Sequence, residues 1–474
     1  MIRIHRLELG AVAAATCLCL AVMSGHLLSI DGLVMWRQAI ALVYHHSWAL
    51  VPPVWWSGTY TSSYRGLGAS AQYFPSLVLF PWLAGHVPVQ AGQQYDFKLI
   101  YSDLLYTVAG APVWVAVTAV TAYITGLMTR LLGGGIRNVV WAIAFFALGS
   151  PALAASRGDW PQPLVAACWA LGAYAALKYR AGGGRRWLWI SAGAVLYAVL
   201  TRPLEGSFLL PGVLLILWVR ERRLSWAIAS QIGAWGAAVA LTLLLNKVRF
   251  GSPTNVGYPG GDVSWTTPIW IGFPSALLSP GRGILWEFPA LILAVIGAAW
   301  LWRTQRRPEA VALAGLPAVL FIEACTYEFW VGGWDWGFRL FEPAFPLLAT
   351  LAGIGVIAIP DRARAWLPGV LLAGGLLWNI PAVSTDLLAG YGQTYADTAS
   401  NWRLDAYPPI GAWRFVNEIF PSAGVGGSPV DIVWFRAVRV VGKVALVPFV
   451  VLVAASIAAW VWTVRQVRLL DPAC

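Results

Sequence analysis

The chain has 474 residues, of which 59% are hydrophobic and 11% are charged, and its formal net charge at pH 7 is +11. A soluble protein of this length carries far more charge, so the composition excludes a soluble globular enzyme and predicts a polytopic membrane protein. Short basic loops that set membrane topology explain the positive charge, and nucleic acid is therefore not expected as a partner. The five cysteines form no CxxC pair, so neither a disulfide framework nor a zinc site is expected.

The first apolar segment follows Arg3 and Arg6, as the apolar part of a signal peptide would. It is longer than such segments, and no A-x-A cleavage site follows it, so we expect an uncleaved first helix. Further apolar segments long enough to cross a bilayer recur along the chain. We predict an all-α protein with about twelve transmembrane helices, at 9–30, 105–129, 138–155, 162–178, 187–201, 203–219, 225–246, 287–302, 309–326, 343–359, 367–381 and 441–463.

Two further apolar segments are predicted to lie at the membrane surface without crossing it. Leu33 to Tyr44 is apolar except for a strip formed by Arg37, Gln38 and His45, which suits a helix in the membrane plane. The stretch YFPSLVLFPWLAGHV, residues 73–87, is short for a span and contains two prolines, so a re-entrant or interfacial helix is expected.

The loops between the predicted spans differ in charge. Five of them are short and basic: RLLGGGIR, KYRAGGGRR, VRERR, RTQRR and PDRAR. Together with Arg3, Arg6, Arg465 and Arg468 they hold 18 of the 32 lysines and arginines. By the positive-inside rule this side and both termini are predicted to be cytoplasmic, in a bacterial inner membrane. We expect a transmembrane core over 1–381, an extracytoplasmic segment over 382–440, and a last helix with a cytoplasmic tail over 441–474.

Candidate functional residues gather on the predicted extracytoplasmic side. Asp31 follows the first apolar segment directly, and an acid at this depth is costly unless it is partnered or functional. It is either a general base or the N-cap of the helix that starts near Leu33. Arginines from five separate segments either extend to lipid phosphates or bind the phosphate of a lipid-linked substrate. They are Arg157, Arg202, Arg249, Arg282 and Arg339.

Three further acids, Asp159, Glu205 and Asp335, are near these arginines in sequence, and ion pairing is their expected role. The histidines are scattered, and no nucleotide-binding loop of the GxxxxGK[ST] type occurs. The sequence therefore requires no cofactor, and it leaves dependence on a divalent metal open.

Four stretches in order along the chain resemble the GT-C superfamily of integral membrane glycosyltransferases, near its family 39 and protein O-mannosyltransferase-like branch. They are SIDG with the following WRQAIAL, SYRGLGASAQYFPSLVLFPW, NKVRFGSPTNVGY with LLSPGRGILWEFPALIL, and WVGGWDWGFRLFEPAFPLL. The resemblance implies that Asp31 is the catalytic base and that the donor is a polyprenyl-phosphate-linked sugar used on the extracytoplasmic face. It also implies that Arg202, Arg282 and Arg339 lie near the donor phosphate.

Two features depart from that pattern. Many relatives have a pair of acids in the first loop, whereas Gly32 follows Asp31 here. In place of a large soluble C-terminal domain we expect only the segment 382–440 before the last predicted span, so the acceptor, whether glycan, lipid or protein, is the least constrained partner.

The leading hypothesis is a polyprenyl-phosphate-sugar-dependent hexosyl- or pentosyltransferase of the cell envelope. The alternatives are a polytopic transporter or lipid flippase, and a non-catalytic membrane assembly factor. Transporters usually carry repeats and polar midplane helices, which this sequence does not show.

Overall fold

The computed structural model describes residues 2–24, 30–50, 54–55, 59–60, 66–82, 104–158, 160–221, 225–257, 264–332, 336–385, 391–395, 397–416, 419 and 430–470. These residues are almost entirely helical. A single short antiparallel ladder pairs β1 (Val54–Trp55) with β2 (Thr59–Tyr60) within them. The predicted all-α fold is therefore confirmed.

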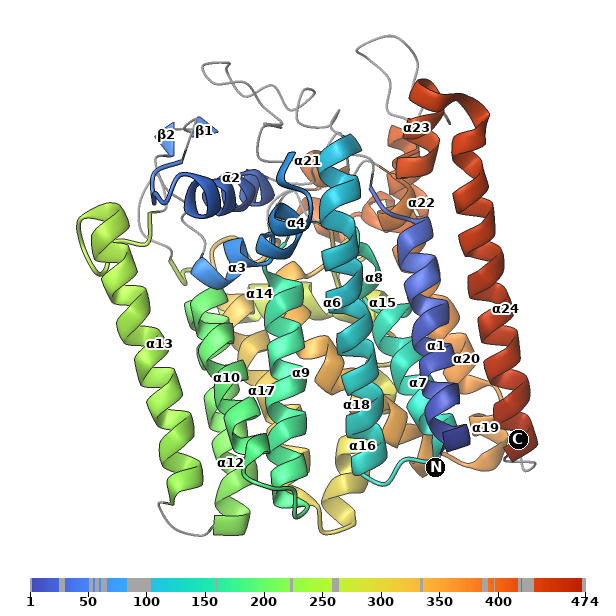
Figure 1. Cartoon of the computed structure of the whole chain (residues 1–474). Coiled ribbons are helices and arrows are strands. Elements are labelled where there is room, and N and C mark those ends of the chain that lie inside the picture. Colours follow the sequence, from blue (N-terminus) through green and yellow to red (C-terminus); the bar gives the residue numbers. More distant parts are fainter. Residues whose placement is uncertain are drawn as a thin grey trace.

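Upright helices form a bundle in which each of the twelve predicted spans is represented (Figure 1). The helices are α1 (Ile2–Ala21), α6 (Leu104–Leu131), α7 (Ile136–Ala147), α9 (Gln162–Arg180), α10 (Arg186–Thr201), α12 (Leu209–Glu221), α13 (Trp226–Phe250), α16 (Leu291–Arg303), α17 (Arg307–Thr326), α18 (Phe345–Ala358), α20 (Leu367–Ser384) and α24 (Leu446–Leu470).

Shorter elements connect these helices. They are α2 (Ile30–Tyr44), α3 (Leu67–Ala71), α4 (Phe74–Leu79), α8 (Ala152–Ala155), α11 (Pro203–Ser207), α14 (Ile269–Leu278), α15 (Ile284–Glu287), α19 (Asp361–Arg364), α21 (Tyr391–Thr394), α22 (Pro408–Gly411), α23 (Val433–Val441) and the 3-10 helices η2 (Arg339–Ala344), η3 (Ser400–Trp402), η4 (Leu404–Ala406), η5 (Ala412–Phe415) and η6 (Gly442–Ala445).

Within the described residues, six helices are long and apolar enough to cross a membrane. They are Val113–Leu131, Trp226–Phe250, Arg307–Thr326, Arg339–Ala358, Asp361–Ser384 and Gly442–Leu470. The remaining upright helices are shorter or carry charges in their end turns, as α9 does with Lys178 and Arg180. The chain is a multi-pass membrane protein.

The first helix lies closer to the N-terminus than predicted. The apolar run indicated a span over 9–30, but α1 ends at Ala21 and includes Glu8 in its lower half. Glu8 is fully buried and forms an ion pair with Arg130 in the last turn of α6, and His5 Nδ1 lies 3.2 Å from its Oε2. An acid buried in a bundle is tolerated when a cation on a neighbouring helix compensates it, so this end of α1 enters the bundle.

The helix α2 lies across the bundle axis at one end, called here the α2 end (Figure 1). Its orientation matches the predicted in-plane helix, but its polar strip does not. Arg37 and Gln38 are buried, 2% and 1% exposed, and only His45 faces outward. The polar side of α2 therefore faces the protein. The described part of the second surface segment, ending at Trp82, forms only the short α4 and does not cross.

The segment Arg339–Ala358, which comprises η2 and α18, lies in the core: 94% of its apolar stretch is buried inside the protein. In Gly442–Leu470, which contains α24, the buried share is only 11%. Two glycines let α16 and α18 approach closely. A Cβ added at Gly297 would overlap the carbonyl of Leu351, and one at Gly355 would overlap the carbonyl of Leu293. Such backbone contact between small residues is typical of helix packing in membranes.

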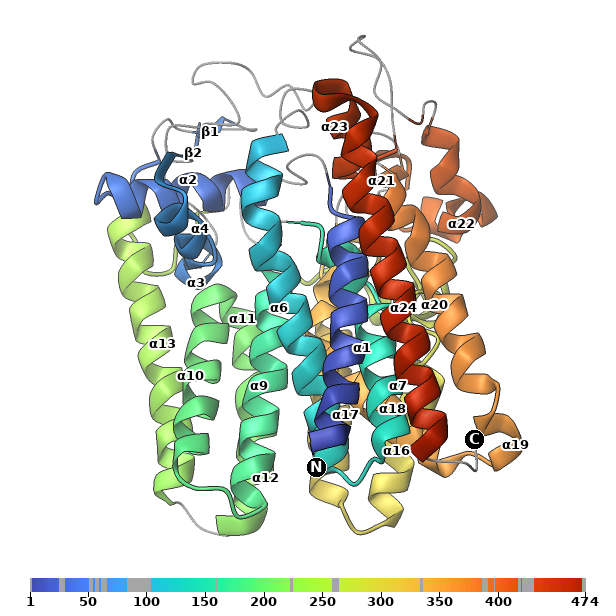
Figure 2. The same ribbon diagram turned by 45° about the vertical axis from the view of Figure 1, so that its right-hand side comes forward.

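Both chain ends lie at the end opposite to α2 (Figures 1 and 2). The helices α6, α9, α12 and α16 also end there, each with a basic residue in its last turn. At the α2 end lie α3, α4, α21, α22 and α23 together with α2 itself (Figure 2). The bundle therefore separates a basic end from an end that holds Asp31.

Candidate active site

Asp31 lies in the first turn of α2, which begins one residue earlier at Ile30. This position differs from the N-cap of a helix starting near Leu33, so the predicted capping role is wrong. A carboxylate in the first turn still complements the positive end of the helix dipole. Asp31 is 4% exposed, which places its charge inside the protein.

Arg339 faces Asp31 from the other half of the chain. Its Nη1 lies 3.7 Å from Asp31 Oδ2, and the two side chains are 17% and 5% exposed. Its Nη2 donates a hydrogen bond to the carbonyl of Gly332 at 3.0 Å, and its guanidinium lies over the ring of Trp160 at 4.5 Å from the centroid. The structure thus brings together two of the predicted site residues. The distance of 3.7 Å between Arg339 Nη1 and Asp31 Oδ2 is longer than a hydrogen bond, so we call this ion pair loose.

Arg282 is fully buried beside the segment that carries Arg339. It lies in the turn between α14 and α15, and its Nη1 donates to the carbonyls of Val331 and, at 3.3 Å, of Gly337. Glu287, also fully buried, accepts a hydrogen bond from the backbone N–H of Phe338 at 2.8 Å. Sequence reasoning named Arg282 for phosphate binding. The described contacts of its Nη1 are with backbone carbonyls.

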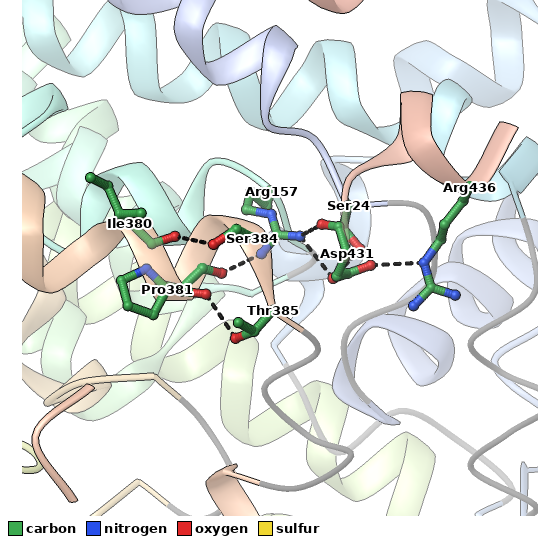
Figure 3. Close-up of polar contacts among 9 residues, drawn as sticks. Ser24, Arg157, Ile380, Pro381, Ser384, Thr385, Asp431 and Arg436 are labelled. Atoms are coloured by element: carbon green, nitrogen blue, oxygen red, sulfur yellow. Dashed lines mark hydrogen bonds and ion pairs between the residues drawn. The ribbon is translucent and has the colours of Figure 1, made fainter. Parts of the chain in front are cut away.

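Arg157 occupies a separate buried cluster (Figure 3). Its Nη2 lies 2.7 Å from Asp431 Oδ2, with side chains 1% and 0% exposed, and also donates to the carbonyl of Asp431. Its Nη1 donates to the carbonyl of Ala382. Arg436 Nε donates to Asp431 Oδ1 at 2.9 Å, and Ser24 Oγ donates to Asp431 Oδ2 at 3.4 Å. The structure therefore places Arg157 against a carboxylate, and Asp431 is a residue that sequence reasoning missed.

Arg202 and Arg249 make contacts within or beside their own helices. Arg202 precedes α11 and forms an ion pair with Glu205, which confirms the pairing predicted for that acid. Arg249, in the last turn of α13, donates to Asn246 Oδ1 at 3.0 Å and lies over Phe250. Asp159 and Asp335 lie outside the described residues.

Among the described residues, no group of three or more histidine, cysteine, aspartate or glutamate side chains is placed to hold a metal ion. Around Asp31 the structure brings together its carboxylate, the facing guanidinium of Arg339 and the indole ring of Trp160. A carboxylate next to a cation can accept a proton, and the cation can neutralise an anion that forms nearby.

No family model matches the chain, and no curated protein matches it in sequence. Its fold does match solved structures. ArnT from Cupriavidus metallidurans in the apo state superimposes with a TM-score of 0.52 at 15% identity, over 95% of this chain and 75% of that one. The structure of the same protein bound to undecaprenyl phosphate gives 0.52 at 14% identity, over 96% and 75%. A weaker likeness, with a TM-score of 0.47 at 12% identity, is to the oligosaccharyltransferase of Archaeoglobus fulgidus, over 83% of this chain and 56% of that one.

The chain has the GT-C fold that the sequence predicted. The likeness concerns the fold, because identity is only 15%. The closer assignment to the family 39 and protein O-mannosyltransferase-like branch stays a prediction.

Proposed function

We propose that the chain is a glycosyltransferase that takes a sugar from a polyprenyl-phosphate-linked donor. The observation that carries the proposal is the meeting of Asp31 and Arg339 at the α2 end, 3.7 Å apart between Oδ2 and Nη1. The shared fold with ArnT, one structure of which holds undecaprenyl phosphate, supports the choice of donor.

In the proposed reaction Asp31 takes the proton of an acceptor hydroxyl, and the hydroxyl oxygen attacks the anomeric carbon of the sugar. The bond between that carbon and the phosphate oxygen breaks, and the phosphate leaves with the bonding electron pair. Arg339 neutralises the charge that develops on the phosphate, because a guanidinium can donate two parallel hydrogen bonds to it. Attack opposite the leaving group inverts the anomeric centre.

The loose pairing of Arg339 suits this role. A guanidinium 3.7 Å from its carboxylate can turn toward a phosphate without breaking a short hydrogen bond to that carboxylate. Trp160 and the carbonyl of Gly332 hold the side chain from other sides, so it need not move far. Among the predicted phosphate-binding arginines we therefore assign this function to Arg339.

We further propose that the α2 end faces the extracytoplasmic side of a bacterial inner membrane. The basic helix ends and both termini lie at the other end, which the positive-inside rule assigns to the cytoplasm. A reporter enzyme fused after residue 470 should be active in the cytoplasm. Activity on the other side would overturn the assignment.

The acceptor is proposed to approach the segment 382–440. Its described part includes the short helices α21, α22, η3 to η5 and the start of α23 at the α2 end, where α22 packs against α20 (Figure 2). The sugar is a hexose or a pentose in this proposal, and the acceptor is an envelope glycan, a glycolipid or a protein.

The test uses purified full-length protein in lipid vesicles. Undecaprenyl phosphate alone is the first probe, with binding measured by native mass spectrometry. The wild type should bind it, and Arg339→Ala should bind it at least about tenfold more weakly, the size of one charge-assisted contact. Undecaprenyl-phosphate-linked glucose, mannose and arabinose, each radiolabelled, are then offered with envelope extract, and covalent transfer is measured.

A matched control is Asp361→Asn, because Asp361 is an exposed carboxylate that pairs with Arg364 at 2.9 Å in α19, at the opposite end of the bundle. It should transfer at the wild-type rate, whereas Asp31→Asn should not. Movement of labelled lipid across the vesicle membrane without any covalent product would instead establish the transporter or flippase. If the folded protein neither binds the lipid nor transfers sugar, the result would favour the membrane assembly factor.

A further inference from the structure

The described residues 331–332 and 336–338, called here the 331–338 loop, precede Arg339 in the chain. Its described glycines, Gly332 and Gly337, have φ values of 76° and 61°, in the left-handed region that favours glycine. Arg339 Nη2 donates back to the carbonyl of Gly332. The position of the guanidinium therefore depends on the backbone of this loop.

Two buried ionisable side chains hold that backbone from the SPGRGILWE stretch. Arg282 donates to the carbonyls of Val331 and Gly337, one at the start and one near the end of the loop. Glu287 Oε2 accepts the N–H of Phe338 at 2.8 Å. Three backbone groups of the loop are thus fixed by side chains from another element.

The fit between Glu287 and the loop is tight. A Cβ added at Gly337 would lie 2.5 Å from Glu287 Oε2 and 3.1 Å from the ring of Trp378. Both Glu287 and Arg282 are 0% exposed. Burial raises the pKa of Glu287 to about 8, against the opposing influence of the Phe338 N–H and of Arg282. The backbone hydrogen bonds satisfy Arg282 Nη1 and Glu287 Oε2.

We propose that Arg282 and Glu287 are positioning residues that set Arg339 against Asp31 by fixing the 331–338 loop. The proposal rests on the proposed function. It replaces the predicted role of Arg282 as a phosphate ligand with a role exerted through the loop backbone.

The effect should be large because the catalytic geometry is demanding. A displacement of about 1 Å at a reacting group can cost about 10²-fold in rate. Arg339 contacts the loop carbonyl at 3.0 Å and Asp31 at 3.7 Å, so a shift of the loop moves it relative to the carboxylate.

The experiment compares Glu287→Gln with Glu287→Leu. Glutamine keeps an oxygen that can accept the N–H of Phe338, and leucine does not, so kcat should fall only a few-fold in the first and about 10²-fold in the second. KM for the donor should change much less than kcat, because the loss concerns the transition state. The matched control is Glu309→Gln, a buried acid paired with Arg180 at the opposite end at 3.0 Å, which should keep the wild-type kcat.

Two readouts separate positioning from a general structural role. Amide hydrogen exchange of the 331–338 loop should be at least about tenfold faster in Glu287→Leu, with other helices unchanged. In an Arg339→Ala background, Glu287→Leu should lower the residual rate little further, because both changes remove the same interaction.

The outcomes also separate this proposal from the proposed function. Wild-type kcat and wild-type exchange in Glu287→Leu would overturn the positioning role while leaving the transferase intact. Fully additive losses in the double variant would also overturn it. If the wild type transfers no sugar, the proposed function fails, and the exchange measurement still decides whether Glu287 holds the loop.

Discussion

Two of the aspartate–arginine pairs at the α2 end, Asp431 with Arg157 and Asp31 with Arg339, are built differently. In the first, Asp431 and Arg157 are 0% and 1% exposed and 2.7 Å apart, and Asp431 also accepts from Arg436 and Ser24. In the second, Asp31 and Arg339 are 5% and 17% exposed and 3.7 Å apart. Short, shared contacts hold chain segments together, whereas the longer Asp31–Arg339 distance fits the role that we propose for this pair in binding the substrate.

The two pairs are also joined through the chain. Arg157 is three residues before Trp160, the ring under Arg339. The backbone around Asp431 bonds to the exit of α1, where Val433 donates to Met23, seven residues before the start of α2. The Asp431 cluster therefore anchors both segments that support the looser pair (Figure 3).

The largest expected effect is a loss of stability when the pair of Asp431 and Arg157 is broken. Asp431→Ala leaves two arginines without their shared carboxylate and should lower the free energy of unfolding by about 3–5 kcal/mol, the usual cost of removing one partner of a buried ion pair. Denaturant titration of the protein in detergent would measure it. Asp361→Asn, which changes a carboxylate that is 91% exposed, is the control and should leave stability unchanged. Equal stability of the two variants would contradict the comparison.

The loose pair should respond in rate and not in stability. Asp31→Asn should lower kcat at least about 10²-fold, the size typical of a lost general base. Its unfolding transition should stay near that of the wild type. Transfer assays and the same denaturant titration check both parts, and a variant that is fully active yet unstable would reverse the assignment.

A third variant asks whether Asp431 needs both cations. Arg436→Ala removes one hydrogen bond to the carboxylate and leaves the 2.7 Å pair with Arg157 in place. A loss of about 1.5–2 kcal/mol in unfolding free energy is expected, at the low end for a bond to a charged group. A loss as large as that of Asp431→Ala would show that Arg157 alone does not hold the segment.

The smallest expected effect is that of Arg339→Lys. Lysine keeps the charge but cannot form two parallel hydrogen bonds to a phosphate, so kcat should fall roughly tenfold with stability unchanged. Steady-state kinetics with the donor varied measures the change. A wild-type kcat would mean that Arg339 acts only as a point charge.

The helices could be predicted from the sequence because hydropathy alone identifies long apolar segments, and each predicted span is helical. The bounds of α1 could not be predicted, because the buried Glu8 is tolerated only through its ion pair with Arg130 on a different helix. The buried face of α2 was missed for a similar reason. In the sequence, the polar side chains of Arg37 and Gln38 indicate a face turned to water, whereas in the structure other parts of the protein cover them.

The site shows the same division. Asp31 and Arg339 could be named because an acid and an arginine beside apolar segments are unusual. Their pairing could not be derived, since they come from opposite parts of the chain. Asp431 gave no signal, because an aspartate in a polar loop is common, and its partner Arg157 precedes it by 274 residues.

The Asp431 cluster also sets an order for biosynthesis. Arg157 is translated 274 residues before its carboxylate. At about 5–20 residues per second the guanidinium waits roughly 14–55 s for that partner. Until then the exit of α1 and the end of α20 lack the group that ties them, so the loose pair cannot be held in its final geometry. In the chain Asp431 is followed by α23, η6 and then the long helix α24, so the cluster can close only once this late part of the chain has been made.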